Sequence, residues 1–367
     1  MNRAIFINSN DRLFMRVKPF AGKYAAKTAD FFYRVNEIQN ERMNDTWVYR
    51  PINSEIEITS KCNQLCPHCG MAANKHNGIS YSEQQLTDYV SQLYDNGIVS
   101  FSITGGEPFI AFENMLKMVE TSRGKVDVCK ITSNGFWGND PSYYFEKMVS
   151  AGLLENQLLV PCLMISIGEQ STPMEDTCAI FAYALSHFSK EEITLCISSL
   201  CEYGKESKVN QFIRTYEKMY GTLPHGRIFL TENYYRNSNC IQQNARDVKG
   251  RNVADYMMGP VRCFEPTIGK YILPRMLVKS TGVVCTCACF NPPEQLYIGN
   301  FRKESVHDIL NKINDNIYVK IIAEDGLHNF RHWINTEECK DVTCSNECEA
   351  CRYLIERFDK IKRSTSI

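Results

Sequence analysis

The alternation of strand and helix patterns between residues 54 and 231 constrains the fold of this chain more than any other feature. Residues 54–60 alternate apolar and polar side chains, as a half-buried strand does. Ser82 precedes Gln85 at the spacing of a helix capping box, and apolar residues then recur at helical spacing from Leu86 to Leu93. This stretch therefore predicts a strand followed by a helix.

The same pattern repeats about five times along the chain. Further strands are expected over residues 98–103, 126–132, 158–167, 193–199 and 227–231, and helices over residues 111–120, 141–151, 174–188 and 209–220. Strands that alternate with helices are typical of βα units and a parallel sheet. About 180 residues are too few for a closed eight-unit barrel, which typically needs about 250. The predicted fold class is therefore α/β, with a partial (β/α)6 TIM-like barrel.

Two regions flank this barrel pattern. Residues 1–50 show only weak periodicity and are predicted to form an N-terminal extension. After about residue 245 the alternation fails, while glycine, proline and cysteine become more frequent. The predicted organisation is an extension over residues 1–50, a partial barrel over 51–245, and a small cysteine-rich α+β domain over 246–367.

Composition and charge narrow the possible functions and locations. Hydrophobic residues make up 44% of the chain, charged residues 23%, and the formal net charge is -1. The overall charge thus gives no reason to expect nucleic acid or an anionic membrane as a partner. No secretory signal and no membrane-spanning apolar run is recognisable, so we expect a cytoplasmic location. The seventeen cysteines are an odd number, and in a reducing compartment clustered cysteines more often bind metals than form disulfides.

Cys62, Cys66 and Cys69 form a C-x3-C-x2-C triplet directly after the first predicted strand. Iron–sulfur clusters are held by cysteine thiolates, and three ligands on a four-iron cluster leave one iron open for chemistry. A structural zinc site would usually have four protein ligands. Parallel βα sheets place their active sites at the carboxyl ends of the strands, where this triplet lies. We therefore interpret the three thiolates as metal ligands and as the catalytic centre.

Three further loops at the same predicted edge carry small or polar residues. The second strand is followed by Gly105, Gly106, Glu107 and Pro108. The third strand is followed by Ser133 and Asn134, and the fourth by Ser166 and Glu169. Paired glycines let a ligand approach the backbone closely, and a carboxylate can accept hydrogen bonds from an ammonium group. Four successive loops therefore bring candidate ligand-binding residues to one rim.

The cysteine triplet and the sequence Gly-Gly-Glu-Pro together resemble the radical SAM superfamily, over about residues 54–235. The resemblance implies that the open iron of a 4Fe–4S cluster chelates S-adenosylmethionine, and that its reductive cleavage yields a 5′-deoxyadenosyl radical that abstracts a substrate hydrogen. It also implies cofactor contacts. By this resemblance, His68 would lie near the adenine of S-adenosylmethionine. The methionyl amine would be contacted by Gly105, Gly106, Glu107 and Pro108, and the ribose or carboxylate by Ser133, Asn134, Ser166 and Glu169.

Eight more cysteines lie in the C-terminal region: Cys263, Cys285, Cys287, Cys289, Cys339, Cys344, Cys348 and Cys351. Eight thiolates are enough for two fully ligated clusters. The spacing from Gly282 to Cys287 and the Gly299-Asn300 turn resemble the SPASM and twitch auxiliary-cluster domains of radical SAM enzymes. The final C-x4-C-x3-C-x2-C departs from the usual spacing. It leaves open whether there are one or two auxiliary clusters, which of Cys285, Cys287 and Cys289 are ligands, and whether zinc binds instead.

These resemblances imply a radical SAM enzyme that oxidatively modifies or crosslinks a ribosomally made peptide. A small-molecule enzyme, such as a sugar or amino-acid dehydrogenase, is the first alternative, and a non-catalytic iron–sulfur or zinc scaffold is the second. The enzyme would need an external electron donor of the flavodoxin or ferredoxin type. We expect neither nucleic acid nor a membrane among its partners.

Overall fold

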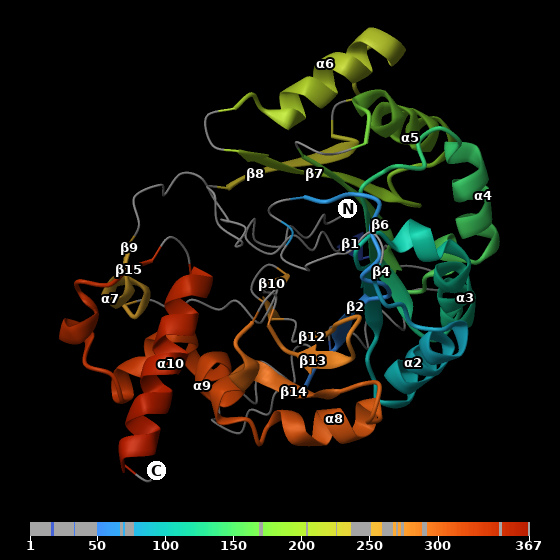
Figure 1. Ribbon diagram of the computed structural model, residues 1–367. Coiled ribbons are helices and arrows are strands. Elements are labelled where there is room, and N and C mark those ends of the chain that lie inside the picture. The colour runs from blue at the N-terminus through green and yellow to red at the C-terminus, as the bar shows by residue number, and fades with distance from the viewer. Residues whose placement is uncertain are drawn as a thin grey trace.

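The computed structural model describes residues 16–17, 33, 50–66, 69, 77–168, 172–202, 205–224, 226–235, 251–258, 267–268, 271–272, 275–287, 292–344 and 347–365. Within these ranges the central feature is a nine-stranded sheet in the order β14-β13-β12-β2-β3-β4-β6-β7-β8. Its curved strands run through the middle of the molecule in Figure 1.

Six neighbouring strands of this sheet are parallel and follow the order of the chain. They are β2 (Asn53–Glu57), β3 (Ser100–Thr104), β4 (Asp127–Ser133), β6 (Cys162–Ile167), β7 (Thr194–Glu202) and β8 (Ile228–Tyr235). The intervening helices are α2 (Glu83–Asp95), α3 (Phe112–Ser122), α4 (Pro141–Ser150), α5 (Met174–His187) and α6 (Lys208–Tyr220). They cover the convex face of the sheet in Figure 1. The predicted partial α/β barrel is therefore confirmed.

Helix α2 shows how local sequence determines these elements. The Ser82 hydroxyl accepts a hydrogen bond from the Gln85 backbone at 3.3 Å, and the Gln85 side chain accepts one from the Ser82 backbone at 3.0 Å. The predicted capping box is thus present, and it satisfies two amides that the helix itself leaves without partners. The apolar face that includes Leu86 and Leu93 is buried against the sheet.

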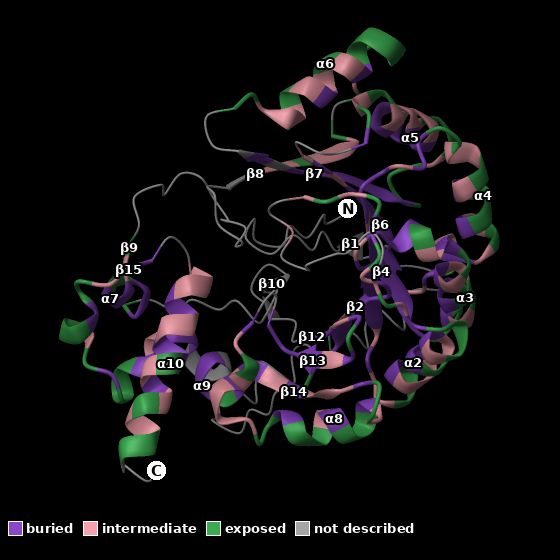
Figure 2. Ribbon diagram, viewed as in Figure 1, coloured by how far each residue is buried: buried purple, intermediate pink, exposed green. Residues whose placement is uncertain are grey.

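The two faces of the sheet have different side chains. Toward the helices, the strands present apolar residues that are almost completely buried, among them Ile56, Phe101, Ile131, Ile165 and Ile197. Figure 2 shows the sheet as buried and the outer helix surfaces as exposed. Alternate residues point the other way, and Lys130 is among them. Its Nζ lies 3.7 Å from Glu55 Oε2, and both side chains are largely buried.

The C-terminal region adds strands to the barrel sheet. Strand β12 (Arg275–Val278) pairs in parallel with β2, and β13 (Val283–Cys285) and β14 (Tyr297–Asn300) continue antiparallel from it. The other described strands and α-helices here are β9 (Arg251–Asn252), α7 (Val253–Tyr256), β10 (Thr267–Ile268), β11 (Tyr271–Ile272), α8 (Val306–Ile313), α9 (Ile317–Asp325), β15 (Thr343–Cys344) and α10 (Glu347–Thr365). One sheet therefore crosses the predicted boundary at residues 245–246, and the three-part division stays a prediction.

Of the first 49 residues, the structure describes Tyr33 and strand β1 (Arg16–Val17). This short strand pairs antiparallel with β5 (Leu159–Val160), beside the start of β6. None of the described helices is both long and apolar enough to cross a membrane.

Candidate active site

The cysteine loop begins directly after β2 and is closed at its base by backbone pairing. Thr59 and Ser80 form an antiparallel bridge, and their hydroxyl oxygens lie 2.7 Å apart. The Ser60 amide donates to Ile79 O at 2.8 Å, and the Tyr81 amide donates to Ile58 O at 3.0 Å. The loop is therefore anchored at the carboxyl edge of the parallel sheet.

The three cysteines of this loop lie close enough together to influence one another. Cys62 is buried, whereas Cys66 and Cys69 are half-buried. The Cys69 amide donates to Cys66 O at 3.0 Å, and the Gln64 amide donates to Cys62 Sγ at 3.4 Å. Burial raises the pKa of the Cys66 thiol to about 11, and the neighbouring Cys69 and Cys62 contribute to the rise. Three thiolates this close together would repel one another, and a cationic metal centre bound between them would remove that repulsion.

Gly105 and Gly106 pack directly against the base of the cysteine loop. A Cβ on Gly105 would come within 2.5 Å of Thr59 O, and one on Gly106 would overlap the carbonyl of Lys61. The Gly106 amide donates to Thr59 O at 2.6 Å, and the Glu107 amide donates to Lys61 O at 2.8 Å. Only glycine allows this close backbone contact between the two loops.

Glu107 joins the second rim loop to the third. Its carboxylate accepts hydrogen bonds from the Phe109 amide at 3.0 Å, the Ser133 hydroxyl at 2.9 Å and the Asn134 amide at 2.6 Å. Burial raises the pKa of this carboxyl from its ordinary 4.5 to about 7, although the three hydrogen bonds oppose the rise. The buried Pro108 begins a short 3-10 helix, Pro108–Ala111.

Asn134 connects the third rim loop to the cysteines. Its Nδ2 donates to Asn63 Oδ1 at 2.7 Å and lies 3.9 Å from Cys62 Sγ. Burial raises the pKa of the Cys62 thiol above its ordinary value, while hydrogen bonds from the Gln64 amide and Asn134 act in the opposite direction. The structure thus brings the Cys62 thiol next to a donor from another loop.

Of the remaining predicted cofactor contacts, the structure describes Ser133 and Ser166. The Ser133 hydroxyl accepts hydrogen bonds from the Gly135 amide and from Trp137 Nε1, both at 3.0 Å. Ser166 is half-buried near the end of β6, level with Ser198 of β7. His68 and Glu169 lie outside the described residues.

The C-terminal cysteines are mostly buried. Cys285 is the last residue of β13, and Cys287 follows it by two positions. Cys339 and Cys344 precede α10, and Cys348 and Cys351 lie in its first turns. Burial raises the pKa of the Cys344 thiol to about 11, and Glu349 and Cys339 add to the rise. No disulfide joins the cysteines of the described ranges. Cys263 and Cys289 lie outside those ranges.

The donor set of the cysteine loop fits an iron–sulfur cluster. Thiolates are soft ligands that suit such clusters, and three of them follow one strand of a parallel sheet. Where the structure describes the chain, no three or more His, Cys, Asp or Glu side chains converge as ligands of a single metal ion. A cubane cluster is wider than one ion and needs its thiolates further apart.

Sequence reasoning did not identify the residues that hold the loop in place. The base of the cysteine loop is closed by the contact between Thr59 and Ser80. The loop is attached to its neighbours by Asn63, which contacts Asn134, and by Gln64, which contacts Thr172. Asn63 and Gln64 occupy the variable positions of the C-x3-C spacing, so the motif itself gives no signal for them. Thr172 completes the contacts, because its hydroxyl donates to Asn134 O at 2.9 Å.

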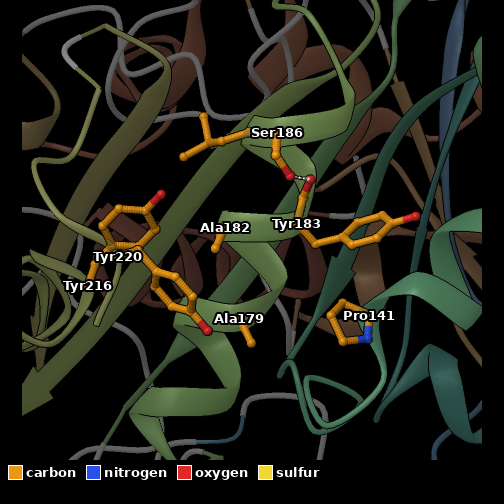
Figure 3. Close-up of a pocket in the computed structure, with 8 residues that line it drawn as sticks. Pro141, Ala179, Ala182, Tyr183, Ser186, Tyr216 and Tyr220 are labelled. Carbon is orange, nitrogen blue, oxygen red and sulfur yellow. Dashed lines mark hydrogen bonds between the residues drawn. The ribbon is translucent and has the colours of Figure 1, made fainter. Parts of the chain in front are cut away.

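A separate groove of about 600 Å³ lies on the outer surface between α4, α5 and α6. Figure 3 shows the rings of Tyr183, Tyr216 and Tyr220 around it, with Pro141 at one side. The Ser186 hydroxyl donates to Tyr183 O at 2.8 Å within its wall. The groove shares no residue with the cysteine site.

Residues 56–167 match the sequence profile of the Radical SAM superfamily. The matched segment contains the cysteine triplet, the Gly105–Pro108 loop and the rim residues Ser133, Asn134 and Ser166. The chain therefore contains a radical SAM domain, which confirms the resemblance on which the predictions above depend.

Curated relatives match only parts of this chain. A Bacillus subtilis protein named "Putative peptide biosynthesis protein YydG" is 26% identical over 129 residues, which cover 34% of this chain and 38% of the relative. A GTP 3′,8-cyclase of Campylobacter jejuni is 25% identical over 196 residues, which cover 47% of this chain and 58% of the cyclase. The chain thus matches about two fifths to three fifths of the length of these relatives.

Among solved structures, Streptococcus suis SuiB bound to its precursor peptide SuiA is similar to this chain. The two are 14% identical with a TM-score of 0.42, and the alignment covers 88% of this chain and 81% of SuiB. This similarity is too low to support a functional argument.

Proposed function

We propose that this protein is a radical SAM enzyme that oxidatively modifies or crosslinks a ribosomally made peptide. The observation that carries the enzymatic part is the packing of the cysteine loop against Gly105, Gly106 and Asn134 at the carboxyl edge of the parallel sheet. Cys62, Cys66 and Cys69 would hold a 4Fe–4S cluster there. When bound and reduced, this cluster supplies the electron that cleaves S-adenosylmethionine to a 5′-deoxyadenosyl radical.

The residues around the cluster would have distinct tasks. Gly105 and Gly106 hold the cofactor-binding rim against the loop base, and Glu107 fixes the third rim loop through its carboxylate. Ser133, Asn134, Ser166, Glu169 and His68 remain proposed contacts of S-adenosylmethionine. The C-terminal cysteines would hold one or two auxiliary clusters, which take up an electron when a substrate is oxidised.

A peptide substrate is supported by the relationship to a peptide biosynthesis protein and by the cysteine-rich C-terminal region. We propose a flavodoxin-like or ferredoxin-like protein as the electron donor. We also propose a cytoplasmic location, since a reducing compartment keeps thiolates available for iron.

Anaerobic reconstitution with iron and sulfide tests the enzymatic proposal. With S-adenosylmethionine and dithionite, the wild-type protein should form 5′-deoxyadenosine, and Cys66→Ala should abolish its formation. Cys178→Ala is the matched control, because Cys178 is a buried thiol on α5, near Phe212. It should retain the reaction. A protein that binds zinc and no iron would make the chain a scaffold and refute the proposal.

A small-molecule substrate is the second candidate, and the match to a GTP 3′,8-cyclase favours it because that match covers more of this chain. Mass spectrometry of native peptide and metabolite pools incubated with the active enzyme separates the two. A peptide that loses hydrogen masses supports the first candidate. A modified nucleotide, sugar or amino acid supports the second.

A further inference from the structure

The two residues after Cys62 attach the cysteine loop to its neighbours. Asn63 Oδ1 accepts a hydrogen bond from Asn134 Nδ2 at 2.7 Å. Gln64 Nε2 lies 3.5 Å from Thr172 Oγ1, which itself donates to the carbonyl oxygen of Asn134 at 2.9 Å. We call Asn63, Gln64, Asn134 and Thr172 the amide latch, because side-chain amides make most of its contacts.

The Cys62 thiol lies inside this latch. Its Sγ accepts a hydrogen bond from the Gln64 backbone amide at 3.4 Å and faces Asn134 Nδ2 at 3.9 Å. Cys62 is 8% exposed and Asn134 is 7% exposed. Polar groups interact more strongly in such a buried place than they do in water.

The orientation of the Asn134 amide is determined from both sides. Its Oδ1 accepts a hydrogen bond from the Phe136 amide at 3.1 Å, while its Nδ2 donates to Asn63. Rotating the amide by half a turn would break both bonds. The donor group must therefore face Cys62, and both polar atoms of the side chain are already bound within the protein.

An N–H donor beside a thiolate ligand has a predictable electrostatic effect. Reduction adds one electron, and thus one negative charge, to a cluster that already carries negative thiolates. Donors that point at the sulfur stabilise the more negative state and raise the reduction potential. The external reductant supplies the electron, and no bond at Asn134 or Cys62 forms or breaks.

We propose that Asn134 is a positioning residue whose amide, aimed by Asn63, orients the Cys62 thiolate and raises the reduction potential of its cluster. This inference rests on the proposed function, because it requires Cys62 to be a cluster ligand. Asn134 would have this role in addition to the contact with ribose or carboxylate that the family resemblance implies.

Three full-length variants test the latch. Asn134→Leu removes the donor, and Asn63→Leu removes the acceptor that aims it. Asn63 is exposed, so this second variant should fold even where the first does not. Asn96→Leu is the matched control, since it removes a side-chain amide that donates to Gln92 O at 2.8 Å. Asn96 lies at the C-terminal end of α2, whereas the cysteine loop precedes the N-terminal end of this helix.

Each protein is reconstituted anaerobically with iron and sulfide and titrated with dithionite under potential control. The readout is the midpoint of the EPR signal that changes when S-adenosylmethionine is added. Iron content and the dissociation constant of S-adenosylmethionine are measured in parallel. We expect Asn134→Leu to shift the midpoint to a more negative potential and Asn96→Leu to leave it unchanged. Asn63→Leu should shift it less than Asn134→Leu does, because Asn63 Oδ1 also lies 3.9 Å from Cys62 Sγ and the loss of this oxygen acts in the opposite direction.

Two results would overturn the inference. One is an unchanged midpoint in both latch variants at full iron content. The other is an Asn134→Leu protein with an unchanged midpoint and an affinity for S-adenosylmethionine weakened by about tenfold or more, which would leave Asn134 with the role of a cofactor contact alone. A wild-type protein without iron, or without a signal sensitive to S-adenosylmethionine, would refute the proposed function itself.

Discussion

At the scale of single residues, Glu107 combines two properties that rarely occur together. Its carboxylate accepts three hydrogen bonds, which favour the charged form, yet burial keeps its pKa at about 7. Its backbone is bound to the base of the cysteine loop through Lys61 O. Glu107 therefore joins its own loop to the cysteine loop and to the loop that carries Ser133 and Asn134. With a pKa of about 7, its carboxyl loses its proton within the physiological pH range.

The pH dependence of stability follows from this raised pKa. Between about pH 4.5 and 7 the folded carboxyl keeps its proton while the unfolded one loses it, so stability falls as the pH rises. The shift corresponds to a loss on the order of 3 kcal/mol across this window. Urea unfolding without S-adenosylmethionine should show this loss in the wild type and a much flatter profile for Glu107→Gln.

Glu120→Gln is the control for this experiment, because Glu120 is an exposed carboxylate on α3. Its profile should follow that of the wild type. Parallel pH profiles for the wild type and Glu107→Gln would show that Glu107 is already ionised in the folded state.

At the scale of elements, the cysteine loop ends directly before helix α2. The loop returns to β2 at Ile79 and Ser80, and the helix begins two residues after Tyr81. The capping box at Ser82 fixes the first turn directly beyond this return. The same loop base therefore depends on strand pairing on one side and on a helix cap on the other.

Ser82→Ala tests the contribution of this cap. Removing the side chain that accepts from the Gln85 amide should lower the free energy of unfolding by about 1 kcal/mol. Ser91→Ala on the same helix is the control. Its hydroxyl only donates to Thr87 O, and we expect a change within about 0.5 kcal/mol. Chemical denaturation measures both, and equal effects would mean that the cap contributes nothing specific.

At the scale of the whole molecule, the C-terminal region is joined to the barrel as part of its sheet. Strand β12 lies beside β2, and Arg275 Nη1 lies 3.9 Å from Glu55 Oε2 on one side. Lys130 of β4 approaches the same oxygen at 3.7 Å from the other. Glu55 thus bridges two strands that are distant in sequence.

Glu55→Gln tests this junction. Breaking a buried ion pair by removing one partner leaves charge behind and typically costs about 3 to 5 kcal/mol, so we expect a loss of this order in urea unfolding. Glu155→Gln is the matched control, because Glu155 pairs with Arg123 in an exposed position. We expect its effect to be below about 1 kcal/mol. If both variants lost a similar free energy of unfolding, the contacts of Glu55 would contribute no more to stability than the exposed pair does.

Much of the barrel and the core of the site could be predicted from the sequence. Strand alternation, the apolar periodicity of the helices and the Ser82 cap are local patterns, and local geometry alone determines the elements that they form. The triplet and the glycine pair were recognisable because their chemistry requires fixed residue types at fixed spacing. The parallel order of the strands then placed both motifs on one edge.

Only the tertiary structure decided which side chains contact these motifs. Asn63 meets Asn134 across 71 positions, and Ser280 donates to Glu57 across 223. The pairing of β12 with β2 crosses a boundary where the sequence pattern changes. Such contacts depend on how strands order themselves in space, and they leave no periodic or spacing signal in the chain. The sequence by itself therefore determined the barrel and the position of its cysteine triplet, whereas folding decided which side chains surround that triplet.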